Sequence, residues 1–187
     1  MSEKIADWLI EQKAISTGER ELYAYAVHCL FSLLYPIAFA SVIGAFLGMP
    51  IEAVVMIMSF IAVRKFSGGY HADSFYKCLI ISSIVIMTML QISNYINNNL
   101  LFNVIYIASS ILLMIFSPID SANKRLDNDD KRFCKKITIL IVVVLFIIVE
   151  LQWIAGYRYY TKFIEPGVML AEILQLLAIF NLKYDRK

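Results

Sequence analysis

Two residue types that can work together as nucleophile and base lie in one short polar segment. His71 and Cys78 are seven positions apart in a chain with only two histidines and three cysteines. A cysteine becomes nucleophilic when a neighbouring base or a positive environment favours its thiolate, and histidine is the usual base. The pair therefore indicates thiol chemistry, with Cys78 as nucleophile and His71 as general base and then acid.

The chain must break between two helical segments for these side chains to meet. On one continuous helix they would share a face but lie about 10 Å apart along the axis, at about 1.5 Å per residue. The glycine pair at 68–69 permits a turn before His71, and Asp73 or Ser74 can cap a new helix. Cys78 would then lie in the first turns of that helix, where the dipole favours a thiolate.

Positive charge around the pair favours the thiolate as well. Arg64 and Lys65 precede the glycines, and Lys77 adjoins Cys78. The competing interpretation is structural, because buried cysteines and histidines are common in protein cores. It predicts that Cys78→Ser is harmless.

The rest of the composition is that of a membrane protein. The 187 residues are 60% hydrophobic, with a mean hydropathy of +0.69, whereas soluble domains are about 45–50% apolar. A net charge of only +2 gives no support for nucleic-acid binding. The three cysteines are too few for a disulfide framework, and no metal-ligand spacing is present. We expect no metal and no other cofactor.

Apolar runs separated by clear breaks predict an all-α polytopic membrane protein with about six transmembrane helices. A spanning helix needs about 20 residues. Residues 1–20 are charged and too short to span, and an apolar stripe through Ile5, Trp8 and Leu9 predicts an amphipathic helix. It either lies in the membrane interface or packs on the protein. We predict one domain over 1–187, with breaks that include Pro166-Gly167. The apolar segments are 22–47, 51–66, 77–96, 100–117, 137–156 and 166–183.

Basic residues alternate between the connections in a way that predicts topology. The connections around Pro50 and at 97–99 have none, whereas the connection holding His71 and the segment 118–136 are basic. Cytoplasmic loops carry the Lys/Arg excess. We therefore expect a multi-pass protein of the cell membrane with both termini and the His71–Cys78 site on the cytoplasmic side.

The motif and a second segment together resemble a known family. The run 64–78 looks like the signature of the accessory gene regulator B (AgrB) family, and the segment 117–124 is similar to that family's second loop, where a proline precedes basic residues. Chain length, hydropathy and the six-segment layout fit as well. The residues that carry the resemblance of the first run are Arg64, Gly68, Gly69, Tyr70, His71, Ala72 and Cys78.

The resemblance implies an activity and roles for these residues. Members of the family are membrane cysteine endopeptidases that process a quorum-sensing precursor peptide, so His71 and Cys78 would be catalytic. Cys78 would remove the precursor's C-terminal tail, hold the remainder as a thioester and release it as a thiolactone or lactone ring. Five further residues would support the motif or bind the substrate: Arg64, Gly68, Gly69, Lys124 and Arg125.

The expected partners are a precursor peptide with an amphipathic leader, membrane lipid and, as a homodimer, a second copy of the chain. The alternative class is a non-enzymatic membrane transporter or an assembly factor for a peptide. A transporter would line a path across all helices with polar residues, whereas motif-like residues are concentrated on one face here. Outside the motif, we expect Cys134 to be non-catalytic and Glu150 to form interhelical hydrogen bonds.

Overall fold

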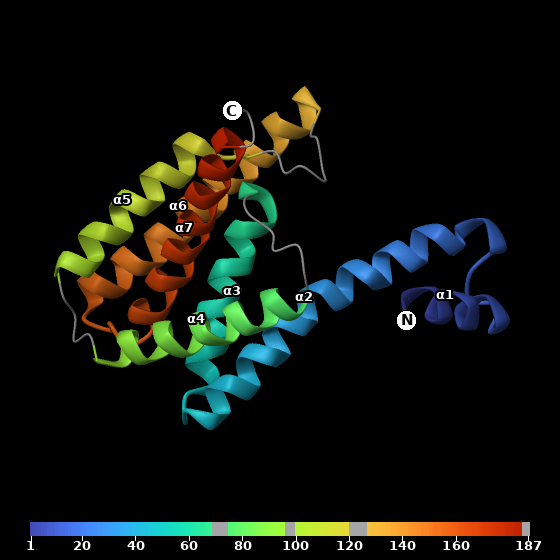
Figure 1. Cartoon of the computed structure of the whole chain (residues 1–187), viewed down its shortest axis with the longest axis horizontal. Helices are drawn as coiled ribbons and strands as arrows, with labels where there is room; N and C mark the ends of the chain where they lie inside the picture. The colour runs from blue at the N-terminus through green and yellow to red at the C-terminus, as the bar shows by residue number, and fades with distance from the viewer. Residues whose placement is uncertain (69–74, 96–99, 120–126, 185–187) are drawn as a thin grey trace. The chain divides into compact units, whose positions relative to one another are not determined.

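The structure is a computed structural model that describes residues 1–68, 75–95, 100–119 and 127–184, without the side chains of 75–80 and 181–184. Within these ranges the regular structure is helical, which confirms the all-α class, and the chain forms two compact units, Met1–Phe39 and Ala40–Lys187. The prediction of a single domain stays a prediction. The helices are α1 (Ser2–Glu11), the 3-10 turn η1 (Thr17–Glu19), α2 (Arg20–Phe46), α3 (Pro50–Ser67), α4 (Phe75–Tyr95), α5 (Leu100–Phe116), α6 (Asn128–Ala155) and α7 (Thr161–Tyr184) (Figure 1).

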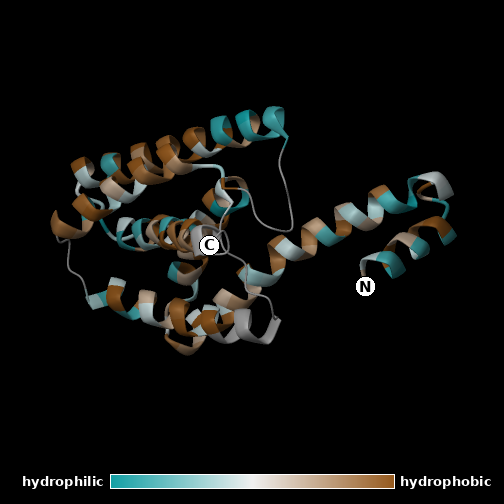
Figure 2. Ribbon diagram, turned by 45° about the horizontal axis from the view of Figure 1, so that its top comes forward, coloured by the Kyte–Doolittle hydropathy of each residue, from teal (hydrophilic) through white to brown (hydrophobic). Residues whose placement is uncertain are grey.

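Three described segments are long and apolar enough to cross a membrane: Thr17–Phe46, Asn128–Ala155 and Thr161–Phe180. Shorter apolar stretches cover Ile81–Tyr95 and Leu100–Phe116. A chain with these helices fits a membrane protein, and six crossings stay a prediction. Figure 2 shows α6 changing from hydrophilic at its beginning to hydrophobic along its length, as expected for a helix that enters an apolar phase.

The beginning of α6 differs from the predicted boundary. The helix begins at Asn128, ahead of the apolar run expected to start at 137. The Asp127 side chain caps it, because its Oδ1 accepts a hydrogen bond of 2.8 Å from the Asn128 backbone N–H. Hydropathy marks only the apolar part of a helix, so the charged first turns escaped that prediction.

The expected break at Pro166-Gly167 is wrong, because both residues lie inside α7. The break comes earlier, at Gly156, which ends α6 in the left-handed conformation with φ 78°. Gly167 has another reason to be glycine. A Cβ there would lie 2.0 Å from Ser59 Oγ and 2.5 Å from the Met56 carbonyl oxygen of α3. The residue therefore permits close packing of α3 against α7.

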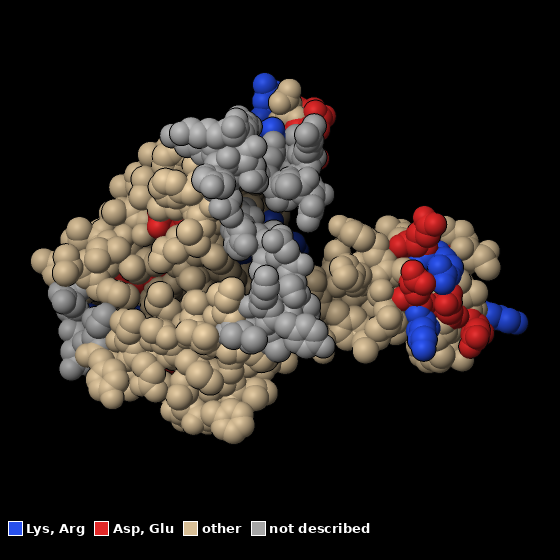
Figure 3. Space-filling view, in the orientation of Figure 1, with Lys and Arg blue, Asp and Glu red and all other residues tan. Residues whose placement is uncertain are grey.

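In the first unit, α1 is joined to the start of α2 by a bidentate ion pair. Arg20 donates from Nε to Asp7 Oδ1 at 2.6 Å and from Nη2 to Asp7 Oδ2 at 3.1 Å. These bonds lower the pKa of Asp7. Trp8 is exposed and Ala6 is buried, and Figure 3 shows charged side chains gathered on this segment. An interfacial position for α1 stays a prediction.

In the second unit, α7 is the central helix. It packs most extensively against α3 and α5, and also against α6 and α4, as the ribbon in Figure 1 shows. Burial of apolar side chains at these contacts makes one continuous core. Its fully buried or nearly buried members are Val63, Tyr106, Leu113, Val142, Val149, Ile164, Val168 and Ala171.

Candidate functional site

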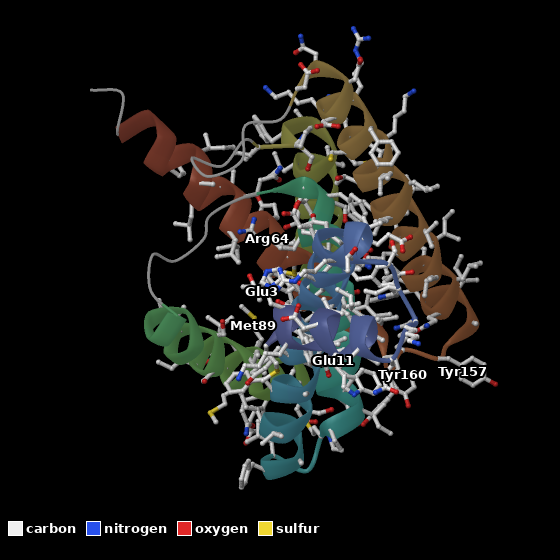
Figure 4. The ribbon with its side chains drawn as sticks, turned by 90° about the vertical axis from the view of Figure 1, so that its right-hand side faces the viewer. Glu3, Glu11, Arg64, Met89, Tyr157 and Tyr160 are labelled. Atoms are coloured by element: carbon white, nitrogen blue, oxygen red, sulfur yellow. The ribbon has the colours of Figure 1, made fainter. Side chains whose placement is uncertain are left out.

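The motif begins where α3 ends. Arg64 and Lys65 occupy the last turn of α3, where positive charge complements the helix dipole. Gly68 then leaves the helix with φ 71° and ψ −161°, a backbone conformation essentially restricted to glycine. Arg64 Nη1 donates a hydrogen bond to the Gly68 carbonyl oxygen (Figure 4). Arg64 therefore holds the backbone at the point where the chain turns away from α3.

The second loop is paired with this turn. The Ile119 backbone N–H donates to the Ser67 carbonyl oxygen at 3.0 Å, and Gly68 and Ile119 form an isolated parallel bridge. A Cβ on Gly68 would lie 2.2 Å from the Ile119 carbonyl oxygen. Gly68 is therefore required by its dihedral angles and by the close approach of the second loop.

A residue of α7 supports the second loop from inside the unit. Gln175 Nε2 donates to Ser117 Oγ at 2.9 Å, and both side chains are buried. Ser117 directly follows α5, and Ile119 is two positions further on. We call Ser67, Gly68, Ser117, Ile119 and Gln175 the loop junction, since together they join α3, α5 and α7 where the motif starts.

The two helices on either side of the motif are separate. α3 ends at Ser67 and α4 begins at Phe75, so an unbroken helix through the motif is excluded and the expected break is confirmed. The backbone of Cys78 lies in the first turn of α4. His71 and Gly69 fall outside the described residues, as do Lys124, Arg125 and the side chain of Cys78. Proximity of the Cys78 sulfur to the His71 imidazole stays a prediction.

The other two cysteines lie elsewhere. Cys29 is exposed in the part of α2 that belongs to the first unit, and Cys134 is half-buried near the beginning of α6. The Cys134 carbonyl oxygen accepts a hydrogen bond of 2.9 Å from Thr138 Oγ1, an ordinary contact within a helix. Among the side chains that are described, no group of three or more His, Cys, Asp or Glu residues could hold a metal ion.

Comparison with known proteins decides the family. The family model described as accessory gene regulator B matches residues 2–179, which is nearly the whole chain. The chain belongs to the AgrB family. The resemblance inferred from the two loop segments is thus confirmed. Membership implies involvement in the processing of autoinducer peptides and connects the protein with quorum sensing.

Similar proteins occur in Clostridium perfringens. An AgrB-like protein of strain SM101 / Type A is 24% identical over 182 residues, covering 93% of this chain and 85% of the relative. AgrB-like protein 2 of strain 13 / Type A is 24% identical over 193 residues, covering 99% and 87%. AgrB-like protein 1 of that strain is 27% identical over 152 residues, covering 78% and 75%. No solved structure is significantly similar to the chain.

Sequence reasoning placed Ser117 in the second loop but missed Gln175 and its pairing with Ser117. The available signal was a buried amide in an otherwise apolar stretch of α7, since an uncharged polar side chain in such a helix needs a partner. The sequence does not identify that partner, because Ser117 is 58 positions away. Only the packing of α7 beside the end of α5 brings the two together.

Proposed function

We propose that this AgrB-family protein is a membrane cysteine endopeptidase that removes the C-terminal tail of a small precursor peptide. Cys78 is the nucleophile, and His71 is the general base and then the general acid. One observation carries the proposal. The Cys78 backbone lies in the first turn of α4, where the positive end of the helix dipole stabilises a thiolate.

The reaction proceeds in two steps. His71 takes the thiol proton, Cys78 Sγ attacks the scissile carbonyl carbon, and the C–N bond breaks as the leaving amine receives that proton. The remaining peptide is then a thioester of Cys78. A thiol or hydroxyl within the peptide attacks the thioester carbonyl and closes a thiolactone or lactone ring. His71 takes the proton of that thiol or hydroxyl, the C–S bond to Cys78 breaks, and the Cys78 thiolate leaves beside the protonated imidazole.

The supporting residues have distinct tasks in this scheme. Arg64 is a positioning residue, because it donates to the Gly68 carbonyl oxygen and so holds the backbone at the turn. Gly68 and Gly69 permit the turn toward His71. Lys124 and Arg125, in the second loop beyond Ile119, supply positive charge for acidic groups of the precursor.

The membrane setting favours ring closure over hydrolysis. A thioester survives for exchange with a second nucleophile only where water is kept away. We place the reaction at the cytoplasmic face of a multi-pass cell-membrane protein, where the basic loops gather. The amphipathic leader of the precursor would bind the lipid surface beside the site.

Co-expression with the cognate precursor, read by mass spectrometry of the peptide products, tests the proposal. Cys78→Ser and His71→Ala should each abolish cleavage, because the first removes the nucleophile and the second removes its base. Cys134→Ser is the matched control and should retain full cleavage. Full processing by Cys78→Ser would contradict the mechanism and favour a transporter or an assembly factor.

A further inference from the structure

A second buried polar cluster lies at the opposite end of the second unit. Asn103 on α5 donates from the same Nδ2 to Glu150 Oε1 on α6 at 3.2 Å and to Glu165 Oε1 on α7 at 3.4 Å. Asn103 is near the start of α5, whereas Ser117 of the loop junction follows its end. At about 1.5 Å per residue the two clusters are about 20 Å apart along α5.

The charge of this cluster is not balanced by a basic side chain. Glu165 and Asn103 are 4% and 6% exposed, and Glu150 is half-buried. Among the described residues, neither carboxylate forms an ion pair with a basic side chain. Two ionised carboxylates around a single amide nitrogen, in an apolar helix bundle, would repel each other and lack compensation. A single proton on one of them removes that repulsion.

A separate observation concerns the buried side chain of Tyr106, whose hydroxyl lacks a hydrogen-bond acceptor among the described residues. Tyr106, one turn from Asn103 on α5, is fully buried, and its hydroxyl has no hydrogen-bond partner among the described residues. The Ser110 hydroxyl, one turn further along α5, likewise has no hydrogen-bond partner among the described residues. A buried donor without an acceptor therefore lies one turn along α5 from Asn103.

Arg158, a basic residue near the cluster, packs on the Trp153 ring. Trp153 Nε1 donates to Glu165 Oε1 at 3.4 Å. The Arg158 guanidinium carbon lies 4.0 Å from the centre of the Trp153 ring, and Arg158 Nε donates to the Trp153 carbonyl oxygen. Arg158 therefore covers the indole and forms no ion pair with Glu165.

Other titratable groups on the packed helices have other partners or positions, and Lys162 of α7 lies over the Tyr159 and Phe163 rings. Glu52 of α3 accepts a hydrogen bond from the Tyr159 hydroxyl, and the other charged residues of α3, Arg64 and Lys65, are in its last turn. The described side chains of α4 include one titratable group, the exposed Tyr95. Glu172 lies two turns along α7 from Glu165, is buried, and has an unpartnered Oε1.

We propose that Glu150 and Glu165 form a proton-binding site, in which the two carboxylates hold one proton between them. Asn103 donates to both oxygens, and the protonated carboxyl is neutral, so α5, α6 and α7 can pack around it. The Tyr106 hydroxyl is the donor available to the partner that stays ionised. This site is independent of the peptidase chemistry proposed for Cys78.

Infrared spectroscopy of the full chain in lipid nanodiscs tests the site directly. The wild type should show the carbonyl stretch of a protonated carboxylic acid at neutral pH. Glu165→Gln should weaken that band, because it removes the more buried of the two carboxylates and leaves Glu150 without a charged neighbour. Glu52→Gln is the matched control, since it removes a carboxylate that has its own Tyr159 partner, and it should keep the band.

Thermal unfolding provides a second measurement that does not depend on the band. Raising the pH removes the shared proton and restores two buried negative charges, so the wild type should lose stability in alkali more steeply than Glu165→Gln. A wild type without the acid band would overturn the proposal. So would unfolding that depends on sodium concentration at constant pH, because the site would then hold a metal cation instead.

Discussion

The two ends of the second unit differ in how their buried polar groups are paired. At the loop junction, the contacts between helices join neutral groups: backbone N–H and carbonyl groups of Ser67 and Ile119, and the Gln175 amide with the Ser117 hydroxyl, while Arg64 donates to the Gly68 carbonyl oxygen. At the opposite end, a single amide donates to two carboxylates, and the Tyr106 hydroxyl has no partner within the part of the chain that the structure describes. The polar groups named at the loop junction have hydrogen-bond partners within the protein. The carboxylate pair at the opposite end needs one bound proton, as proposed above, to remove its charge repulsion.

This difference in pairing indicates a different role for each end of the second unit. Hydrogen bonds between neutral groups, such as those of Ser67 with Ile119 and of Gln175 with Ser117, do not titrate with pH and hold their partners rigidly. This suits the anchoring of a loop that must position a reacting group. A pair of buried carboxylates is costly unless it is neutralised, and intramembrane ionisable groups mark functional sites by default. Each prediction below tests this difference between the loop junction and the carboxylate pair.

Membrane topology should give an all-or-none result. In a cysteine-free background, we expect an impermeant maleimide to label Asn98→Cys in intact cells and Asn128→Cys only after lysis. The reason is that the connection at 97–99 has no basic residues, whereas the segment 118–136 is rich in them. The loop junction would then face the cytoplasm and the carboxylate pair the outer side. The reverse labelling pattern would place the proposed active site outside the cell.

Gly68→Ala should lower precursor cleavage by about tenfold or more. The substitution imposes about 1–3 kcal/mol of backbone strain and directs a Cβ to within 2.2 Å of the Ile119 carbonyl oxygen. Gly156→Ala is the matched control, because Gly156 also has a positive φ of 78° but open space around it. It should cost about 1–2 kcal/mol of unfolding free energy and leave cleavage unchanged. Equal losses of cleavage in both variants would show that the contact with Ile119 is unimportant.

Gln175→Leu should have the smallest effect, a loss of about 1–3 kcal/mol in the free energy of unfolding, because it leaves the buried Ser117 hydroxyl without a partner. Combining it with Ser117→Ala should recover most of that loss, since both polar groups are then removed. A double-mutant cycle by thermal unfolding measures the coupling. Both variants should behave alike at neutral and alkaline pH. A pH-dependent coupling would abolish the contrast with the carboxylate pair.

Much of this protein followed from local properties of the sequence. Hydropathy located the apolar parts of the three described segments that could cross a membrane, because apolar side chains must occupy continuous stretches of a helix in an apolar phase. The chain break after Ser67 followed from the glycine pair at 68–69, since glycine alone adopts such dihedral angles without strain. The family followed from the run 64–78, because its residue types and spacing are specific.

Other features depended on contacts between distant segments. Pro166 was assigned to a break, yet it lies inside α7, where the adjoining Gly167 admits the backbone of α3. Glu150 was expected to form an interhelical hydrogen bond, but its sharing of Asn103 with Glu165 could not be foreseen. The physical reason is the same in both cases. Periodicity and composition define which residues enter a helix, whereas the partner of a buried polar group is defined only when helices pack side by side.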